Sequence, residues 1–156
     1  MNLKLICVGQ KMPAWISAGF QEYALRLTGQ CRLQLIELAP AKRTKSGVAA
    51  KYMEEEAQRI ESVLSGNPLR IVLDEHGAVV DTKAVAKRME QWLPSGRDVA
   101  FIVGGPDGLA PSIKQSADWC WSLTPLTLPH PLVRVMLAEQ LYRAWSLMNH
   151  HPYHRE

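Results

Sequence analysis

The sequence predicts an α/β fold, a single-domain, mainly parallel sheet flanked by helices. Short apolar runs alternate along the chain with longer segments of mixed polarity, which is the pattern of strands joined by helices. The chain has 156 residues, about the length of one domain, and 47% of them are hydrophobic, as in ordinary globular proteins. We therefore expect one domain that covers residues 1–156.

The first half of the chain contains two predicted helices. Residues 13–29 form the first, because this segment opens with a proline and closes with a glycine. Residues 48–66 form the second, an amphipathic helix on which Glu54, Glu55 and Glu56 are expected to lie on the solvated face. The predicted strands around these helices are the apolar runs 3–9, 31–39 and 70–75.

The second half continues the alternation. A helix over residues 81–93 begins at Asp81 or Thr82, since both residue types cap helix amino termini well. The other predicted elements are strands at 98–105 and 118–123, a short helix at 111–117 and a long helix from Pro131 to about Asn149. The long helix is apolar nearly all round, so we expect it both in the core and at a subunit interface. Its Glu139 and Arg143 are predicted to form a surface ion pair.

Composition argues against several classes of protein. The longest apolar runs fall short of the ~18 residues that a membrane-spanning helix needs, so a cytoplasmic protein without a membrane partner is the simplest expectation. Cys7, Cys31 and Cys120 are widely spaced and form no C-x-x-C pair that would suggest a zinc or redox site. We expect all three to be reduced thiols packed in the protein interior.

The charge of the chain is mildly basic. A net charge of +3 permits a nucleic-acid partner without requiring one. Lys42, Arg43 and Lys45 lie in a segment punctuated by proline, serine and glycine, which predicts a loop. These cations either contact phosphates or belong to a solvated loop.

Three strand ends form the candidate ligand site, because ligands of parallel α/β sheets bind at the carboxyl ends of the strands. Gly104, Gly105 and Gly108 would let the backbone approach a ligand closely, or would only shape a tight turn. Their spacing matches neither a nucleoside-triphosphate loop nor a dinucleotide fingerprint. The segments at the three strand ends are "LDEHG" at 73–77, "VGGPDGLA" at 103–110 and "SLTPLTLPHP" at 122–131.

The third of these segments is predicted to be stiff. Pro125, Pro129 and Pro131 fix the backbone at three positions and remove three N–H donors. The remaining backbone groups could recognise an adenine edge and a ribose as a preformed wall of a pocket. Alternatively, the loop is only a rigid crossover between a strand and a helix.

The segments "LDEHG", "FIVGGPDGL", "SLTPLTLPHPLVRVMLAEQLYRAW" and "HPYHR" together resemble the ribosomal large subunit methyltransferase H family, the pseudouridine N3-methyltransferases of the SPOUT class. The resemblance runs from Met1 to Arg155. It implies an α/β fold with a deep trefoil knot at the carboxyl end, and S-adenosylmethionine as methyl donor. The implied cofactor contacts are Leu73, Gly104, Leu123, Thr124, Pro125, Leu126, Thr127 and Leu128, and we add the neighbouring Gly105.

The resemblance also implies partners and a substrate. Members of the family are homodimers that methylate a pseudouridine in a stem-loop of the large-subunit (23S) ribosomal RNA, within the assembled ribosome. This would suit a chain of modest positive charge, because the shape of the ribosomal site and a base drawn out of its stack could supply much of the recognition.

The end of the chain offers groups that methyl transfer to an imide nitrogen needs. His154 could accept the N3 proton, Arg155 could hold the charge that develops, and Tyr153 could stack on the base. His130 beside the predicted cofactor loop is a second candidate base, with helix capping or loop packing as its alternative role. The sequence does not rank the two histidines, and water could also take the proton.

Other functions remain open from the sequence alone. The chain could be a non-catalytic ribosome-binding or assembly factor of the same fold, although such a factor has no need of a nucleoside pocket. A metallohydrolase that uses the histidines of the tail is disfavoured, because no cysteine or carboxylate lies nearby and Pro152 breaks any helical pairing of His150 with His154. We therefore expect no metal.

Overall fold

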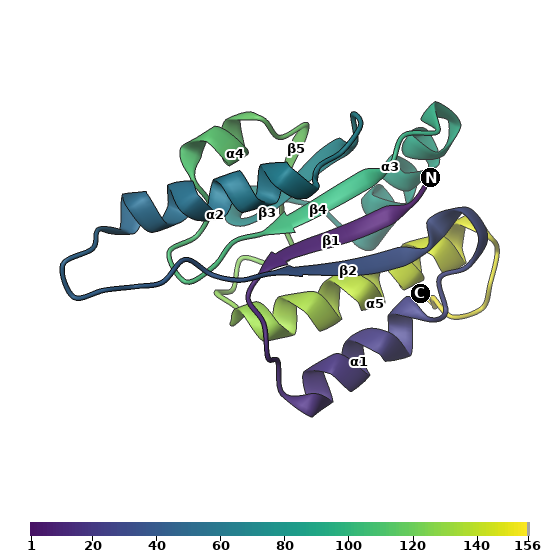
Figure 1. Ribbon diagram of the computed structural model, residues 1–156. Helices are drawn as coiled ribbons and strands as arrows, with labels where there is room; N and C mark the ends of the chain where they lie inside the picture. The colour runs from purple at the N-terminus through teal and green to yellow at the C-terminus, as the bar shows by residue number, and fades with distance from the viewer. Residues whose placement is uncertain (156) are drawn as a thin grey trace.

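The computed structural model describes residues 1–155, which contain one five-stranded sheet (Figure 1). The strand order is β2-β1-β4-β3-β5, and every neighbouring pair is parallel. This arrangement confirms the predicted α/β class with a mainly parallel sheet. The strands are β1 (Leu3–Val8), β2 (Leu33–Leu38), β3 (Leu69–Val79), β4 (Val99–Val103) and β5 (Trp119–Ser122).

Helices cover both faces of the sheet. The helix α5 packs against α1 and α3 on one face, and α2 and α4 lie on the other (Figure 1). Short 3₁₀ turns occupy residues 29–31 and 93–95. The helices are α1 (Ala14–Ala24), α2 (Ala49–Val63), α3 (Thr82–Trp92), α4 (Pro111–Gln115) and α5 (His130–Met148).

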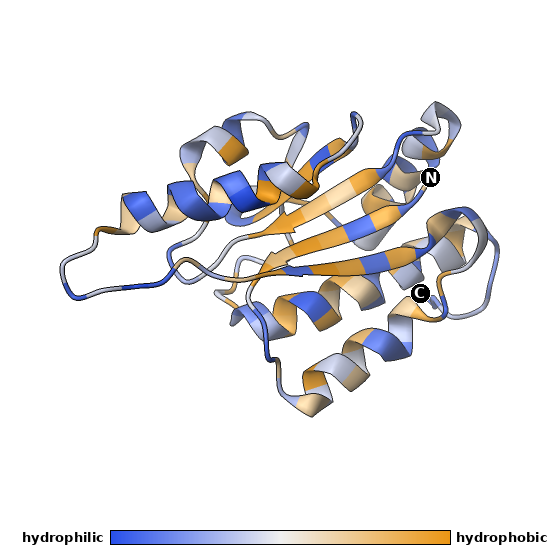
Figure 2. Ribbon diagram, viewed as in Figure 1, coloured by the Kyte–Doolittle hydropathy of each residue, from blue (hydrophilic) through white to orange (hydrophobic). Residues whose placement is uncertain are grey.

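Successive side chains of β1 point to opposite faces of the sheet and so belong to two separate apolar clusters. Leu3, Leu5 and Cys7 join the apolar cluster beneath α1, α3 and α5, whereas Ile6 and Val8 join the cluster beneath α2 and α4. Figure 2 shows the strands as mainly hydrophobic and the helices as mixed, as expected for a sheet that is covered on both faces.

Most element boundaries agree with the sequence predictions to within three residues, and two differ by more. The helix α1 ends at Ala24, and i→i+3 bonds such as that from Leu27 N–H to the Ala24 carbonyl tighten the chain before Gly29. The strand β3 continues to Val79, because both Leu73 and Ala78 pair with Trp121 of β5 and the residues between them bulge outward.

Two smaller predictions hold. The Asp81 carboxylate caps α3, where it accepts a hydrogen bond from the Ala84 N–H at 2.9 Å.

The three cysteines are free thiols, buried at Cys7 and Cys31 and half-buried at Cys120. Burial raises the pKa of Cys7 to about 12, so this thiol stays protonated. The trefoil knot implied by the resemblance stays a prediction.

Candidate cofactor pocket and active site

A cavity of about 620 Å³ lies at the carboxyl ends of the strands. Val8 of β1, Leu73 of β3, Val103 of β4 and Ser122 of β5 line it, and all three strand-end segments singled out in the sequence contribute to its walls. Its size and largely apolar lining are those of a small-molecule site. The predicted location of the ligand site at these strand ends therefore coincides with a real cavity.

Glycines shape the turn after β4. A Cβ atom on Gly104 would lie 2.7 Å from the carbonyl carbon of Gly108, and Gly108 itself adopts a φ of +84°. A Cβ atom on Gly105 would lie 2.9 Å from Oε1 of Glu56. All three glycines line the cavity, but the close approach that requires Gly104 and Gly105 is to the protein's own atoms.

The proline-rich loop is held by its own hydrogen bonds. The Ser122 hydroxyl donates to the Thr124 carbonyl at 2.7 Å, and the Thr124 hydroxyl accepts from the Leu126 N–H at 3.2 Å. The Thr127 hydroxyl donates to Glu75 at 3.1 Å, which ties this loop to the bulge of β3. Leu123, Thr124, Leu126 and Leu128 line the cavity, whereas Pro125 and Thr127 are exposed and lie outside its lining.

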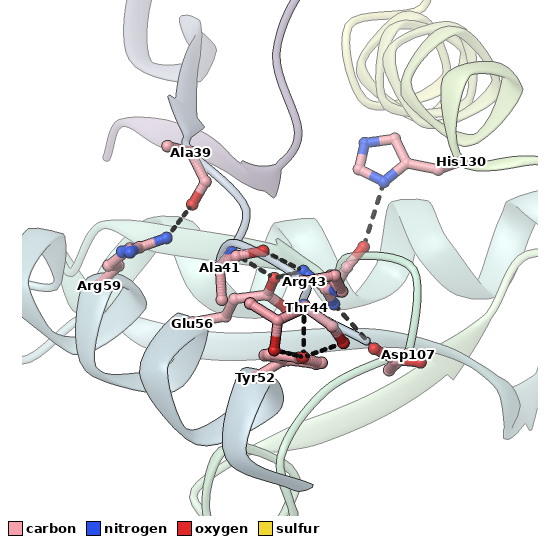
Figure 3. Close-up of polar contacts among 10 residues, drawn as sticks. Ala39, Ala41, Arg43, Thr44, Tyr52, Glu56, Arg59, Asp107 and His130 are labelled. Atoms are coloured by element: carbon pink, nitrogen blue, oxygen red, sulfur yellow. Dashed lines mark hydrogen bonds and ion pairs between the residues drawn. The ribbon is translucent and has the colours of Figure 1, made fainter. Parts of the chain in front are cut away.

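The prediction that Glu56 lies on a solvated face is wrong. Its side chain is 2% exposed and accepts hydrogen bonds from the Ala41 N–H at 2.9 Å and from Arg43 at 2.6 Å (Figure 3). Arg43 also binds Asp107 of the glycine turn at 2.8 Å, so it connects the basic loop to the cavity wall. Tyr52 and Ile60, four residues to either side of Glu56, are buried too, and this i,i+4 stripe was the signal in the sequence.

The cations of the basic loop therefore fall into two groups. Arg43 is already paired with two carboxylates and stacks 5.0 Å above the ring centroid of Tyr52. Lys42 and Lys45 are exposed. Only the two lysines present their charges to solvent in the way that a phosphate contact requires.

His130 lies at the first turn of α5 and lines the cavity. Its Nδ1 is 3.1 Å from the Gly104 carbonyl oxygen, and its Nε2 is 3.1 Å from Nε of Arg134. Arg134, which is 1% exposed, also binds Glu37 at 2.6 Å and the Gly9 carbonyl at 2.9 Å. The sequence gives no indication of this role for Arg134, because its partners Glu37 and Gly9 lie at two distant strand ends.

The tail packs on the last turns of α5. The Tyr153 hydroxyl donates to Glu139 at 3.0 Å, and Nη1 of Arg143 lies 3.3 Å from Nδ1 of His154. Burial and the Glu139 carboxylate raise the pKa of Tyr153 to about 12. Glu139 and Arg143 form the predicted pair, but both are partly buried and hold Tyr153 and His154, while Arg155 is exposed.

The tail follows the carboxyl end of α5 (Figure 1), whereas the cavity lies at the amino end of this helix. His130 begins this helix at the cavity, and its 19 residues span roughly 28 Å at 1.5 Å per residue. Among residues 1–155, Tyr153, His154 and Arg155 contribute nothing to the lining of the cavity. In one chain the cavity thus brings seven of the nine predicted cofactor residues together with His130, all except Pro125 and Thr127, and the predicted catalytic tail lies apart from them.

Among residues 1–155, no group of three or more histidine, cysteine, aspartate or glutamate side chains is placed to hold a metal ion. Within the same residues, every helix is too short or too polar to cross a membrane.

Comparisons with known proteins identify relatives over the whole chain. The family model described as "Predicted SPOUT methyltransferase" matches residues 1–154. The chain is 56% identical over 156 residues to the ribosomal RNA large subunit methyltransferase H of Hydrogenovibrio crunogenus, with all of both chains covered. It is 51% identical over 155 residues to the protein of the same name from Nitrosococcus oceani, with 99% of both chains covered.

Solved structures share the fold at low sequence identity. A probable methylase family protein from Haemophilus influenzae superposes with a TM-score of 0.61 at 11% identity, covering 99% of this chain and 70% of that protein. A probable methyltransferase from Bordetella pertussis gives 0.58 at 15% identity, covering 91% of this chain and 95% of the other. At these identities the likeness shows the fold alone.

Proposed function

Because this chain belongs to the SPOUT methyltransferase family, we propose that it transfers a methyl group from S-adenosylmethionine to N3 of a pseudouridine in large-subunit (23S) ribosomal RNA. Curated relatives about half identical over the full length are named ribosomal RNA large subunit methyltransferase H. The observation that carries the proposal is the cavity at the strand ends, to which three of the four segments that carry the sequence resemblance contribute. The enzyme acts in the cytoplasm, on the ribosome.

The cavity suits a nucleoside cofactor. Its volume is sufficient for a molecule of that size, its walls are largely apolar, and the proline-rich loop is fixed by its own hydrogen bonds. S-adenosylmethionine, when bound, supplies an electrophilic methyl group on a sulfonium sulfur. In our proposal Leu73, Gly104, Gly105 and the loop from Leu123 to Leu128 form its binding site.

The chemistry at the substrate requires removal of a proton. The N3–H proton of pseudouridine would be removed, and the negative charge that develops would be shared with the two flanking carbonyl oxygens. N3 would then bond to the methyl carbon as the bond from this carbon to sulfur breaks, which would leave S-adenosylhomocysteine. His154 can take the proton once its Nδ1 is released from Arg143, Arg155 can stabilise the oxygen charge, and Tyr153 can contact the face of the base. These roles are proposals for groups that lie together on the tail.

The separation of tail and cavity supports a site shared between two subunits. The tail of one chain is held at the far end of its own α5 by Glu139 and Arg143. In a homodimer whose α5 helices run antiparallel about a two-fold axis, each tail would approach the cavity of the partner. Leu132 and Met136 of α5 are half-buried and Trp15 of α1 is 63% exposed, which leaves apolar surface for such an interface.

The RNA would dock mainly through the shape of its ribosomal site. The exposed Lys42 and Lys45 can add phosphate contacts near the cavity, because their loop continues from Pro40, which lines it. Two exposed cations give only a modest electrostatic contribution.

The decisive experiment compares nucleosides from large-subunit RNA of cells with and without this gene by mass spectrometry. We expect a methylated pseudouridine to disappear when the gene is deleted and to return with a plasmid copy. Identical nucleoside profiles would show that the substrate assignment is wrong. Calorimetric titration with S-adenosylmethionine separates the enzyme from a docking factor of the same fold, because a factor without a cofactor site would bind none at millimolar concentration.

A further inference from the structure

Each ring nitrogen of His130 faces a partner that can act in only one way in a hydrogen bond, one as an acceptor and the other as a donor. The Gly104 carbonyl oxygen, 3.1 Å from Nδ1, can only accept a hydrogen bond, so Nδ1 must carry a proton. Nε of Arg134, 3.1 Å from Nε2, can only donate, so Nε2 must present its lone pair. Together the two contacts select the neutral ring protonated on Nδ1.

The position of Arg134 is fixed by burial and by hydrogen bonds to other segments. The residue is 1% exposed, and the other two guanidinium nitrogens donate to Glu37 at 2.6 Å and to the Gly9 carbonyl at 2.9 Å. An arginine stays protonated in proteins, so the donor that faces Nε2 is permanent. Glu37 and Arg134 are the charged groups that face this ring, and the cation is the one in direct contact with it.

We propose that His130 is a positioning residue that anchors the Gly104 carbonyl through its Nδ1–H, and that it is not the base that accepts the pseudouridine proton. The proposal rests on the methyltransferase function above and concerns the same cavity. A proton on Nε2 would displace the hydrogen bond from Arg134 and place an imidazolium against a buried guanidinium. Burial and Arg134 lower the pKa of His130, which agrees with a ring that stays neutral.

The anchor matters because the Gly104 carbonyl lies outside the hydrogen bond that closes the turn after β4, which runs from the Gly108 N–H to the Gly105 carbonyl at 3.0 Å. Gly104 and Gly105 carry no side chains, and glycine explores more backbone conformations than other residues. The peptide between them is trans, so holding the Gly104 carbonyl toward His130 directs the Gly105 N–H to the opposite side. His130 thereby sets the orientation of one peptide in the cavity wall before any cofactor enters, which reduces the cost of ordering on binding.

The protonation state can be measured on the unmodified protein. In ¹⁵N-labelled protein, two-bond ¹H–¹⁵N correlation spectra distinguish Nδ1–H from Nε2–H rings, and the His130 signals are those that vanish in His130→Asn. We expect a neutral Nδ1–H ring that does not change between pH 6 and pH 9. An Nε2–H ring, or a ring that titrates within this range, would refute the proposal even if no RNA substrate were known.

Substitution separates anchoring from proton transfer. In His130→Asn the side-chain amide N–H stands where Nδ1–H stood, so the bond to Gly104 can be kept, whereas His130→Ala loses it. We expect the dissociation constant for S-adenosylmethionine to rise roughly five- to tenfold in the alanine variant, the effect of one hydrogen bond, and less than threefold in the asparagine variant.

Methylation rates provide the second readout. A positioning role predicts that His130→Asn keeps kcat within about tenfold of the natural enzyme. If His130 were the base, kcat would fall roughly 10²- to 10⁴-fold in both His130→Asn and His130→Ala, with unchanged affinity for the cofactor. That result would overturn the proposal. If the natural protein methylates no ribosomal RNA, the proposed function fails, while the spectra and the cofactor titrations still decide the role of His130.

Discussion

Glu56 connects the basic loop to the glycine turn after β4. Its carboxylate is buried, accepts hydrogen bonds from Ala41 and Arg43 through Oε2, and leaves Oε1 without a hydrogen-bond partner among the described residues. That second oxygen lies against Gly105, where any Cβ atom would come within 2.9 Å of it. The position of the glycine turn therefore depends on a carboxylate from α2, which in turn depends on a cation from the basic loop.

Removing that cation should loosen both segments. Arg43→Ala leaves the buried Glu56 without its ion pair, and we expect the free energy of unfolding to fall by roughly 2 kcal/mol. Urea denaturation followed by circular dichroism measures the change. Lys45→Ala is the matched control, because this exposed cation of the same loop should change stability by less than about 0.5 kcal/mol. Equal denaturation midpoints for Arg43→Ala and the natural protein would contradict this account.

The fall in the free energy of unfolding at acidic pH should depend in part on His130. Its pKa is lowered in the folded protein, so below the ordinary value of 6.5 the unfolded chain takes up a proton that the folded ring does not. The contribution is present above that pH and is lost as the pH falls through the folded pKa. We expect the natural protein to lose more stability than His130→Asn between pH 8 and pH 5, as measured by urea denaturation at each pH. Parallel profiles would show that the ring does not contribute.

Single residues were predictable from the sequence where the cause is local. The Asp81 cap needs only the start of a helix beside an aspartate, and the buried thiols follow from the apolar runs around Cys7 and Cys31. The burial of Glu56 and Arg134 has a tertiary cause. Each is compensated by partners on other segments, and a single sequence does not show that such partners will meet.

Among the elements, the strand β3 likewise has one part with a local cause and one part with a tertiary cause. Its apolar start was predictable from residue pattern, but its continuation to Val79 results from pairing with β5 on both sides of a bulge. Gly77 lies in that bulge, and a Cβ atom there would come within 2.8 Å of the backbone at Cys120 and Trp121. The bulge also brings Asp74 and Glu75 to the cavity, so a local irregularity of the strand helps to build the site.

Filling the space at Gly77 should therefore be costly. Gly77→Ala forces β3 away from β5, and we expect a loss of about 1–3 kcal/mol in unfolding free energy together with weaker binding of S-adenosylmethionine. Thermal denaturation and calorimetric titration measure the two effects. The exposed neighbour His76 supplies the control, since His76→Ala removes side-chain atoms that lie mostly in solvent. If Gly77→Ala and His76→Ala have the same melting temperature, the close approach of β3 and β5 does not require a glycine at position 77.

At the scale of the whole molecule, the sequence patterns predicted the class of fold and the end of the sheet at which the cavity lies. Strand and helix periodicities are local, and the location of ligand sites follows from the parallel sheet. The distance between tail and cavity was not predictable in this way. It depends on the direction of α5 across the sheet and on the contacts of Glu139 and Arg143 with the tail.

A mixed dimer can test whether the tail acts on the partner. One chain carries Leu128→Trp, which fills the cavity, and keeps its tail; the other has an intact cavity but ends after Asn149. Calorimetry first checks that Leu128→Trp has lost cofactor binding. Each parent homodimer should be inactive, and the mixed dimer should recover up to about half of the natural methylation rate, because one of its two sites is complete. A mixed dimer that binds cofactor but transfers no methyl group would restrict the tail to its own chain.

The helix α5 also acts as a molecular ruler. Its first residue borders the cavity and its last turns hold the tail, so the number of residues between them sets a distance and an angle at once. One inserted residue would advance everything beyond it by about 1.5 Å and rotate it by roughly 100° about the helix axis. In the shared site proposed above, an insertion within residues 131–147 would therefore misdirect Tyr153 and His154, whereas the exposed residues 45–47 could absorb an insertion of the same size. If the tail completes the partner's site, the length of this helix determines the geometry of that site independently of the side chains it carries.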